Sequence, residues 1–203
     1  MSKNVLGVLC SGRGSNLQSI IEAIERGQIK AEIGVVIANK PDAMALERAR
    51  RAGIPAVCVN HKEFDGQTAF EAKMAEVLKA HGITLVILAG FMRILSPYFV
   101  HEFAGKIMNI HPSLLPSFGG AHAHRDVLAY GVKVSGCTIH FVDEGMDSGP
   151  IILQTTVPVL DDDDEDTLAA RVLEKEHILY PRAIELYLNG ALEVEGRKVK
   201  IKN

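Results

Sequence analysis

An amide and an imidazole occur two positions apart in the segment "MNIHPSLLPSFGGAHAHR", residues 108–125. Asn109 and His111 alternate with the apolar residues Met108 and Ile110, which is the period-2 pattern of a β-strand. Their side chains are therefore expected on one face at the end of a strand. An amide and an imidazole presented together suit acid–base chemistry or the stabilisation of a developing negative charge.

Three kinds of site compete for this segment. A zinc site would use His111, His122, His124 and an acid, but the last two histidines stand at i, i+2 with no Cys or Glu at ligand spacing. A serine nucleophile at Ser113 would need a G-x-S-x-G elbow, and the sequence reads "HPSLL". We favour the third kind, a metal-free site for acyl transfer. There Asn109 donates a hydrogen bond to an oxyanion, and His111 as an imidazolium stabilises the same charge or protonates the leaving nitrogen.

An imidazolium at near-neutral pH requires a nearby carboxylate, because an opposite charge favours the protonated form. Asp147 is the best candidate, since it lies in the glycine-flanked turn "DEGMDSGP" between two strand-like runs. Asp143 and Glu144 are the alternatives, and either is also compatible with a solvated turn residue.

A glycine-containing segment, "CSGRGSNLQSI", follows the first apolar run and opens a helical pattern. Gly12 and Gly14 allow a tight turn with exposed backbone N–H groups, which bind anions at a helix N-terminus. Ser15 and Gln18 have the spacing of a capping box. The third glycine of a dinucleotide motif would fall at Leu17, and a Walker A ending is missing. A single phosphate monoester is the predicted ligand, and a plain strand-to-helix turn is the alternative.

The first half of the chain alternates between apolar runs of strand length and helical patterns, which predicts a parallel sheet covered on both faces. The predicted strands are Val5–Cys10, Ile33–Ala38, Ala56–Val59, Leu85–Ala89 and Ile107–Ile110, and the predicted helices cover Leu17–Ile24, Asp42–Arg51 and Gln67–His81.

The second half changes character after Gly131. It carries the long strand-like runs Val132–Val142 and Ile151–Val159, joined by a turn, and we expect them to be antiparallel. The acidic run Asp161–Asp166 precedes a helix to about Leu188, where carboxylates suit the helix dipole. A small hairpin is expected in "LEVEGRKVKI". The predicted fold class is α/β: a Rossmann-like, mostly parallel sheet with helices on both faces and antiparallel strands added in the C-terminal part.

Composition narrows the function classes. The chain has 203 residues, 5% aromatic residues, no Trp and a net charge of −3, so neither a base-stacking surface nor a basic patch for nucleic acid is expected. No apolar segment approaches 18 residues and the N-terminus lacks a signal peptide pattern, so we expect no membrane partner and a cytoplasmic location. Cys10, Cys58 and Cys137 are expected to be buried free thiols of a reducing compartment.

Five segments occur in one order over nearly the whole chain: "SGRGSN", "LAGFMRILSP", "NIHPSLLPSFGGAHAHR", "HFVDEGMDSGPIILQ" and "EHILYP". Together they closely resemble the phosphoribosylglycinamide formyltransferase family. Its members transfer the formyl group of N10-formyltetrahydrofolate to the amine of glycinamide ribonucleotide in de novo purine synthesis. No single motif is decisive, but five in register are highly specific.

The resemblance implies a role for each matching position, in one domain spanning 1–203. Its N-terminal half, 1–105, would bind phosphate, and its C-terminal half, 106–203, would carry catalysis and folate binding. Asn109, His111 and Asp147 match the catalytic residues, and no metal is implied. The positions that match the ribonucleotide site are Gly14, Ser15, Asn16, Gly90, Pro112, Leu173, Glu174, Lys175 and Glu176, the last of which reaches the ribose. The positions that match the folate site are Met92, Arg93, Ile94, Leu95, Asn109, Asp143, Glu144, Gly145, Met146 and Asp147.

The chain also departs from the family. Some members carry an arginine near the folate tail where this chain has Gln67, so one contact to the glutamate tail is not carried over. In "SFGGAHAHR" the family more often has proline or lysine at Gly119 and leucine at Ala121, so this loop is left out of the predicted site. His122, His124 and His140 are interpreted as hydrogen-bonding scaffold.

Other functions share parts of this pattern. Methionyl-tRNA formyltransferase is expected to add a C-terminal domain and a basic face, and formyltetrahydrofolate hydrolase an N-terminal regulatory domain. A sugar-nucleotide formyltransferase is expected to be longer and to lack this phosphate loop. A non-catalytic nucleotide-binding module would explain the turn at 12–16 but not Asn109, His111 and Asp147 together. The expected partners are small molecules only, bound by a monomer or homodimer.

Overall fold

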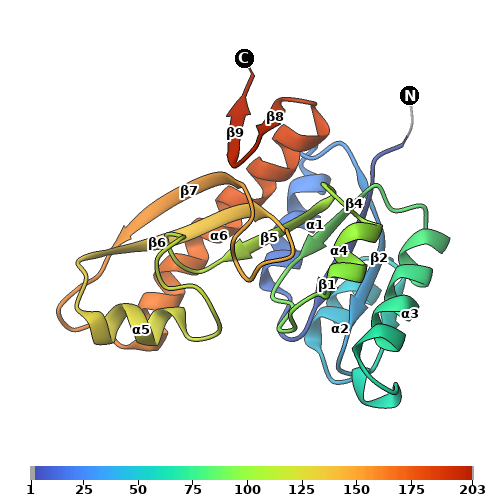
Figure 1. Cartoon of the computed structure of the whole chain (residues 1–203), viewed down its shortest axis with the longest axis horizontal. Coiled ribbons are helices and arrows are strands. Elements are labelled where there is room, and N and C mark those ends of the chain that lie inside the picture. The colour runs from blue at the N-terminus through green and yellow to red at the C-terminus, as the bar shows by residue number, and fades with distance from the viewer. Residues whose placement is uncertain (1–2, 203) are drawn as a thin grey trace. The chain divides into compact units, whose positions relative to one another are not determined.

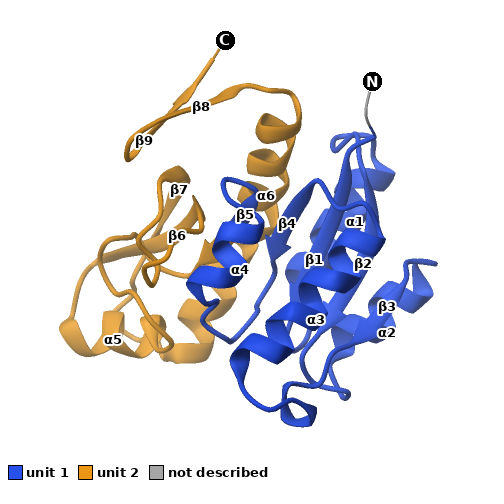
Figure 2. Cartoon of the chain, turned by 45° about the vertical axis from the view of Figure 1, so that its right-hand side comes forward, with its two compact units in different colours: residues 1–108 blue, residues 109–203 orange. Residues whose placement is uncertain are grey.

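The computed structural model describes residues 3–202, and the chain divides into two compact units, coloured separately in Figure 2. Unit 1 comprises Met1–Met108 and unit 2 comprises Asn109–Asn203. The boundary falls close to the expected one between the phosphate-binding and catalytic halves. The assignment of the whole chain to one domain stays a prediction.

Unit 1 alternates strands and helices along the chain. Its strands pair in parallel in the order β3-β2-β1-β4, and all six residues of β1 are buried, as expected of a strand covered on both faces. The elements are β1 (Val5–Cys10), α1 (Ser15–Glu25), β2 (Glu32–Ala38), α2 (Met44–Arg51), β3 (Ala56–Cys58), the 3₁₀ helix η1 (His61–Glu63), α3 (Gln67–Ala80), β4 (Leu85–Leu88), α4 (Pro97–Glu102) and the start of β5 (Ile107–His111).

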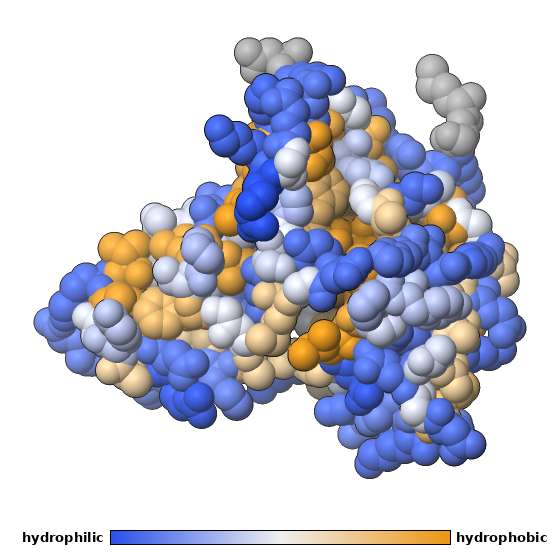
Figure 3. All heavy atoms as spheres, in the orientation of Figure 1, coloured by the Kyte–Doolittle hydropathy of each residue, from blue (hydrophilic) through white to orange (hydrophobic). Residues whose placement is uncertain are grey.

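Two pairs of helices cover this sheet (Figure 1): α1 contacts α2, and α3 contacts α4. Strand order steps outward from β1 through β2 to β3 and then returns to β4, so right-handed crossovers place the two pairs on opposite faces. In Figure 3 hydrophilic residues gather over α3, whose outer side carries ion pairs such as Lys73–Glu76. The predicted parallel α/β arrangement is confirmed.

Unit 2 is built around an antiparallel pair, β6 and β7, which Figure 1 shows side by side. The order β6-β7-β9-β8 adds the C-terminal hairpin to β7, so the expected antiparallel strands and hairpin are confirmed. Helix α6 packs on β6 and β7 over an apolar core that includes Cys137 and Val172. After the last residues of β5, the elements are α5 (Ala123–Tyr130), β6 (Val134–Phe141), β7 (Ile151–Pro158), α6 (Glu165–Leu188), β8 (Leu192–Glu195) and β9 (Lys198–Ile201).

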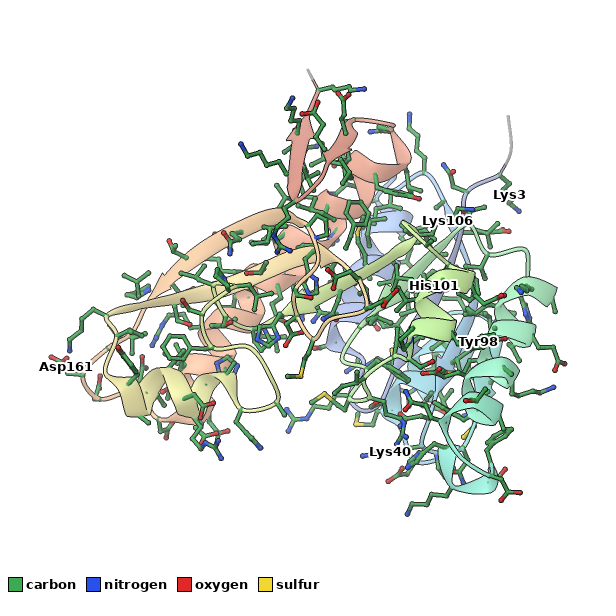
Figure 4. All side chains as sticks on the ribbon, in the orientation of Figure 1. Lys3, Lys40, Tyr98, His101, Lys106 and Asp161 are labelled. Atoms are coloured by element: carbon green, nitrogen blue, oxygen red, sulfur yellow. The ribbon has the colours of Figure 1, made fainter. Side chains whose placement is uncertain are left out.

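The acidic run before α6 starts the helix. Asp164 and Thr167 form a capping box, in which the Thr167 N–H donates to Asp164 Oδ1 at 2.8 Å and the Asp164 N–H donates to Thr167 Oγ1 at 2.9 Å. Asp163 accepts two hydrogen bonds from Arg171, at 2.7 and 2.8 Å, which lower the pKa of its carboxyl. Asp161, on the connection from β7 to α6 (Figure 4), pairs with Lys133. These carboxylates have structural partners, as the helix-start interpretation predicts.

Some expectations about the fold were wrong. Cys58 is exposed, because β3 ends the strand order of unit 1 and offers only partial cover. Cys10 and Cys137 are buried free thiols as predicted, and burial raises the pKa of each to about 12. The short helices α4 and α5, of six and eight residues, were not predicted. Within residues 3–202, no helix is long and apolar enough to cross a membrane.

Candidate active site

The turn after β1 in unit 1 has the geometry of an anion site. Gly14 is the N-cap residue of α1 with φ 71°, and a Cβ there would lie 2.9 Å from both Cα and Cβ of Ala45. Only glycine fits, because the left-handed conformation and the contact both exclude a side chain. The amides of Arg13, Gly14 and Ser15 have no acceptor among residues 3–202. These three donors lie in the turn and at the N-terminus of α1, where a phosphate was predicted.

The predicted capping box of Ser15 and Gln18 is wrong. Gly14 occupies the N-cap position, which makes Ser15 the first helical residue, and no side chain caps the helix. The side chain of Gln18 makes other bonds: its Nε2 donates to Glu22 Oε1 at 3.2 Å, and its Oε1 accepts from Arg48 Nη1 at 3.3 Å. The start of α1 therefore keeps its amides for another acceptor.

The segment after β4 joins this turn within unit 1. β1 and β4 are parallel neighbours, so the segments following them emerge at the same sheet edge, where open α/β sheets bind ligands. The Ser11 N–H donates to Gly90 O at 3.0 Å, and the Met92 N–H donates to Ser11 Oγ at 2.8 Å. Two parts of the predicted site, the phosphate turn and the folate-binding segment at 92–95, are thus linked through one buried serine.

The side chains at 92–95 differ in exposure. Met92 and Ile94 are 71% and 65% exposed, whereas Leu95 is buried in the core. The guanidinium carbon of Arg93 lies 5.4 Å from the centroid of the Phe70 ring, a cation–π contact. The exposed side chains of Met92 and Ile94, next to Arg93, form a surface that suits a flat, partly polar ligand.

Gln67 braces this segment. Its Nε2 donates to Ile94 O at 2.8 Å and to Glu71 Oε1 at 2.9 Å, and Glu71 also accepts from the Ser96 N–H at 2.9 Å. Gln67 therefore holds the backbone of the predicted folate segment, a role that the sequence did not reveal.

Unit 2 brings the three predicted catalytic residues together. Strand β5 delivers Asn109 and His111, and the β6–β7 turn delivers Asp147. His111 Nδ1 lies 3.5 Å from Asp147 Oδ2, with the two side chains only 6% and 15% exposed. The carboxylate of Asp147 therefore faces the imidazole ring of His111 in a largely buried position.

The loop after β5 holds both members of this pair. His111 Nε2 lies 2.9 Å from Phe118 O, and a carbonyl oxygen only accepts, so Nε2 carries a proton. The Gly120 N–H donates to Asp147 Oδ2 at 2.8 Å. The loop backbone therefore contacts both members of the pair, with a carbonyl oxygen at the ring of His111 and an amide at the carboxylate of Asp147.

The alternatives to Asp147 have other partners. Asp143 Oδ1 accepts from Ser148 Oγ at 2.6 Å and from the Gly145 N–H at 3.1 Å, which makes it a turn-forming residue. Glu144 is exposed. Asp147 itself has φ 51°, an uncommon left-handed backbone that turns its carboxylate toward His111. Strain of this kind at a non-glycine residue is frequent at functional sites.

Asn109 is oriented by His140. His140 Nδ1 donates to Phe141 O at 2.8 Å, so its Nε2 is free to accept from Asn109 Nδ2 at 3.3 Å. Burial lowers the pKa of His140, which keeps the ring neutral and able to accept. The second N–H of the Asn109 amide remains available to a ligand.

The other histidines and Ser113 behave differently. The scaffold prediction is confirmed for His140 but wrong for His124, whose buried Nδ1 has no hydrogen-bond partner among residues 3–202. Ser113 is fully buried and donates to Ser117 O at 2.7 Å, as expected if it is no nucleophile. The described residues contain no group of three or more His, Cys, Asp or Glu placed to hold a metal ion.

A cavity of about 420 Å³ opens beside Asp147, lined by Leu115, Gly119, Met146 and Arg197 among others. Arg197, on the C-terminal hairpin, donates to Ser148 O at 2.6 Å and so closes one side of the Asp147 turn. Of the predicted folate positions Asp143–Asp147, Met146 and Asp147 thus border an open volume next to His111.

The remaining predicted positions lie on the loop after β5 and on α6. Pro112 follows His111 directly and is half-buried. Leu173–Glu176 lies in the middle of α6, where Glu176 is 6% exposed and its charge contributes to the raised pKa of Cys137 on β6. Glu176 is therefore a buried carboxylate, whereas Glu174 and Lys175 are exposed.

Comparison with known proteins gives the family. The family model described as "Formyl transferase" matches residues 4–184. The chain belongs to the formyl transferase family. The phosphoribosylglycinamide formyltransferase of Escherichia coli K12 is 46% identical to this chain, over 92% of this chain and 88% of its own length. The crystal structure of glycinamide ribonucleotide transformylase 1 from Symbiobacterium toebii matches 99% of this chain and 95% of that one, at TM-score 0.97 and 48% identity.

Longer relatives match as well. The trifunctional purine biosynthetic protein adenosine-3 of Drosophila melanogaster is 48% identical over 91% of this chain. This chain spans 14% of the length of that protein and 19% of the human protein of the same name. The resemblance of the sequence to folate-dependent formyltransferases is confirmed at the level of the family.

Proposed function

We propose that this formyl transferase moves the formyl group of N10-formyltetrahydrofolate to the amine of glycinamide ribonucleotide, a step of de novo purine biosynthesis. The observation that carries the proposal is the arrangement in unit 2, where the pair His111–Asp147 and the oriented amide of Asn109 are presented by one strand end and one turn. Relatives of similar length carry the corresponding names, which supports the substrate assignment.

The reaction places a negative charge on the formyl oxygen. The substrate amine attacks the formyl carbon, the carbonyl π electrons move to oxygen, and a tetrahedral oxyanion forms. The free N–H of Asn109 donates to that oxygen, and the imidazolium of His111 stabilises it through its charge. Both N–H groups of His111 face protein acceptors, Phe118 O and Asp147, so charge stabilisation fits the geometry better than direct proton donation.

Collapse of the intermediate requires proton transfer. The attacking nitrogen becomes positively charged and must lose a proton, while the folate nitrogen must gain one as its bond to the formyl carbon breaks. The carboxylate of Asp147 borders the open cavity, and we propose that it relays the proton through water. The Gly120 N–H donates to this carboxylate and holds it in position beside the cavity.

Binding is assigned to the remaining predicted positions. The amides at Gly14, Ser15 and Asn16 would hold the phosphate, which suits a monoester, and Glu176 would reach the ribose. The pterin would lie against the backbone of Met92–Leu95 and the turn Asp143–Asp147, with Gly90 and Pro112 at the glycinamide end. The proposal involves no metal.

A panel of acceptors tests this function. Loss of the formyl group from N10-formyltetrahydrofolate is followed by absorbance with glycinamide ribonucleotide, an amino-sugar nucleotide, methionyl-tRNA or water alone. Turnover only with glycinamide ribonucleotide supports the proposal. Equal turnover with water would make the protein a hydrolase, and a preference for another amine would replace the substrate.

A further inference from the structure

We propose that Arg48 is a positioning residue for the phosphate-binding turn, a role that rests on the phosphate site proposed above. Arg48 lies on α2, outside the motif that identifies the turn, and its half-buried side chain points back to it. Its part would be to set the direction in which the amides of the turn point.

Helix α2 holds the turn at two consecutive carbonyl groups. The Ala45 N–H donates to Gly12 O at 3.0 Å, and Arg48 Nε donates to Arg13 O at 2.8 Å. Arg48 Nη1 also donates to Gln18 Oε1 at 3.3 Å, which fixes the guanidinium against α1. Two adjacent peptide groups of the turn are thereby tied to α2, one by a backbone amide and one by Arg48.

Because the trans peptide is planar, these hydrogen bonds to the carbonyl groups also determine where the neighbouring N–H groups point. The C=O of one residue and the N–H of the next point in opposite directions across the peptide plane. Because the carbonyls of Gly12 and Arg13 turn toward α2, the N–H groups of Arg13 and Gly14 turn away from it. These are two of the three amides without an acceptor in residues 3–202. Without Arg48, the Arg13 carbonyl loses its donor and the 13–14 peptide can rotate its N–H out of the site.

Charge adds to the positioning. Arg48 has no ion-pair partner among residues 3–202, whereas Arg50 and Arg51 on the same helix both pair with Glu47. An uncompensated guanidinium directly behind the turn attracts a phosphate dianion bound on its other side.

Calorimetric binding of ribose 5-phosphate tests the role without requiring turnover. Arg48→Met should bind about ten- to hundredfold more weakly than the wild type, the range expected for loss of a charge-assisted contact. Arg48→Lys keeps the charge and one donor and should fall between them. Arg51→Met is the matched control. Arg48 and Arg51 both line a cavity of about 270 Å³, but Arg51 bonds Glu47, so this variant should bind like the wild type.

The outcomes separate this inference from the proposed function. If the wild type binds ribose 5-phosphate and Arg48→Met binds it equally well, the role of Arg48 is overturned. If the wild type itself does not bind ribose 5-phosphate, the phosphate site is contradicted, and with it the proposed function on which the role of Arg48 rests. In the transfer assay, Arg48→Met should lose kcat/KM for glycinamide ribonucleotide but not for the dephosphorylated riboside. Equal losses with both would indicate general damage to the fold and contradict positioning.

Discussion

Asp147 Oδ2 lies 3.5 Å from His111 Nδ1 and at the same time accepts a hydrogen bond from the Gly120 N–H. One carboxylate oxygen therefore contacts both the imidazole of His111 and the loop that follows it. Phe118 O completes the arrangement on the other ring nitrogen of His111. The pair thus consists of two side chains, and backbone groups of the following loop contact both of them.

Replacing Asp147 with asparagine removes the negative charge with little change in size. We expect kcat to fall by about 10²–10⁴-fold, the range for loss of an acid–base group, while KM for the folate changes little. Asp161→Asn is the control, because Asp161 is an exposed partner of Lys133 in the same unit and should leave kcat unchanged. Near-normal turnover of the Asp147 variant would remove this residue from the mechanism.

Stability should depend on pH through His140. Burial lowers its pKa in the folded protein, so the unfolded chain, with a pKa of about 6.5, binds the proton more readily. Stability should therefore be lost as pH falls below about 6.5 and be retained above it. His124, whose pKa burial also lowers, contributes in the same direction.

Thermal unfolding between pH 5 and 7.5 measures this dependence. His140→Gln keeps a hydrogen-bonding side chain but cannot titrate, so its melting temperature should fall less steeply with decreasing pH than that of the wild type. An unchanged slope in the variant would show that His140 is not the titrating group.

Gly14→Ala should damage the phosphate turn. The left-handed backbone costs about 1–2 kcal/mol for a residue with a Cβ, and the contact with Ala45 adds an overpacking cost of about 1–3 kcal/mol. Gly53→Ala separates the two costs, because Gly53 has φ 70° but open space around its Cβ position. Denaturant titration should show the larger loss for Gly14→Ala; equal losses would mean that the contact with Ala45 is relieved without cost.

Chelation should leave the activity unchanged. The proposed chemistry assigns charge stabilisation to Asn109 and His111, so dialysis against EDTA is expected to preserve turnover. Loss of activity that zinc restores would revive a site built on His111, His122 and His124.

Much of the candidate site could be predicted from the sequence, because the types of its side chains and the period-2 pattern of the strand indicate which residues lie together. Alternation with Met108 and Ile110 predicted that Asn109 and His111 act together, and the turn composition predicted Asp147. The backbone groups of Phe118 and Gly120 were not predictable, since any residue supplies a carbonyl and almost any an amide.

Errors arose where tertiary contacts overrode local patterns. Gln18 has capping-box spacing, but Arg48 and Glu22 take its side chain while Gly14 takes the N-cap position. Arg48 looks like one more surface cation in "LERARR", and only the fold shows which of these arginines reaches the turn. Cys58 sits in an apolar run but on the last strand in the order, where cover is incomplete.

Transfer of a labelled formyl group tests the central claim most directly. The purified protein is mixed with N10-formyltetrahydrofolate carrying ¹³C in the formyl carbon and with glycinamide ribonucleotide, and the products are resolved by NMR. The account predicts that the label appears in the formylated ribonucleotide, and only when the amine is present. Label recovered as free formate at the same rate without the amine, or left on the folate, would contradict it.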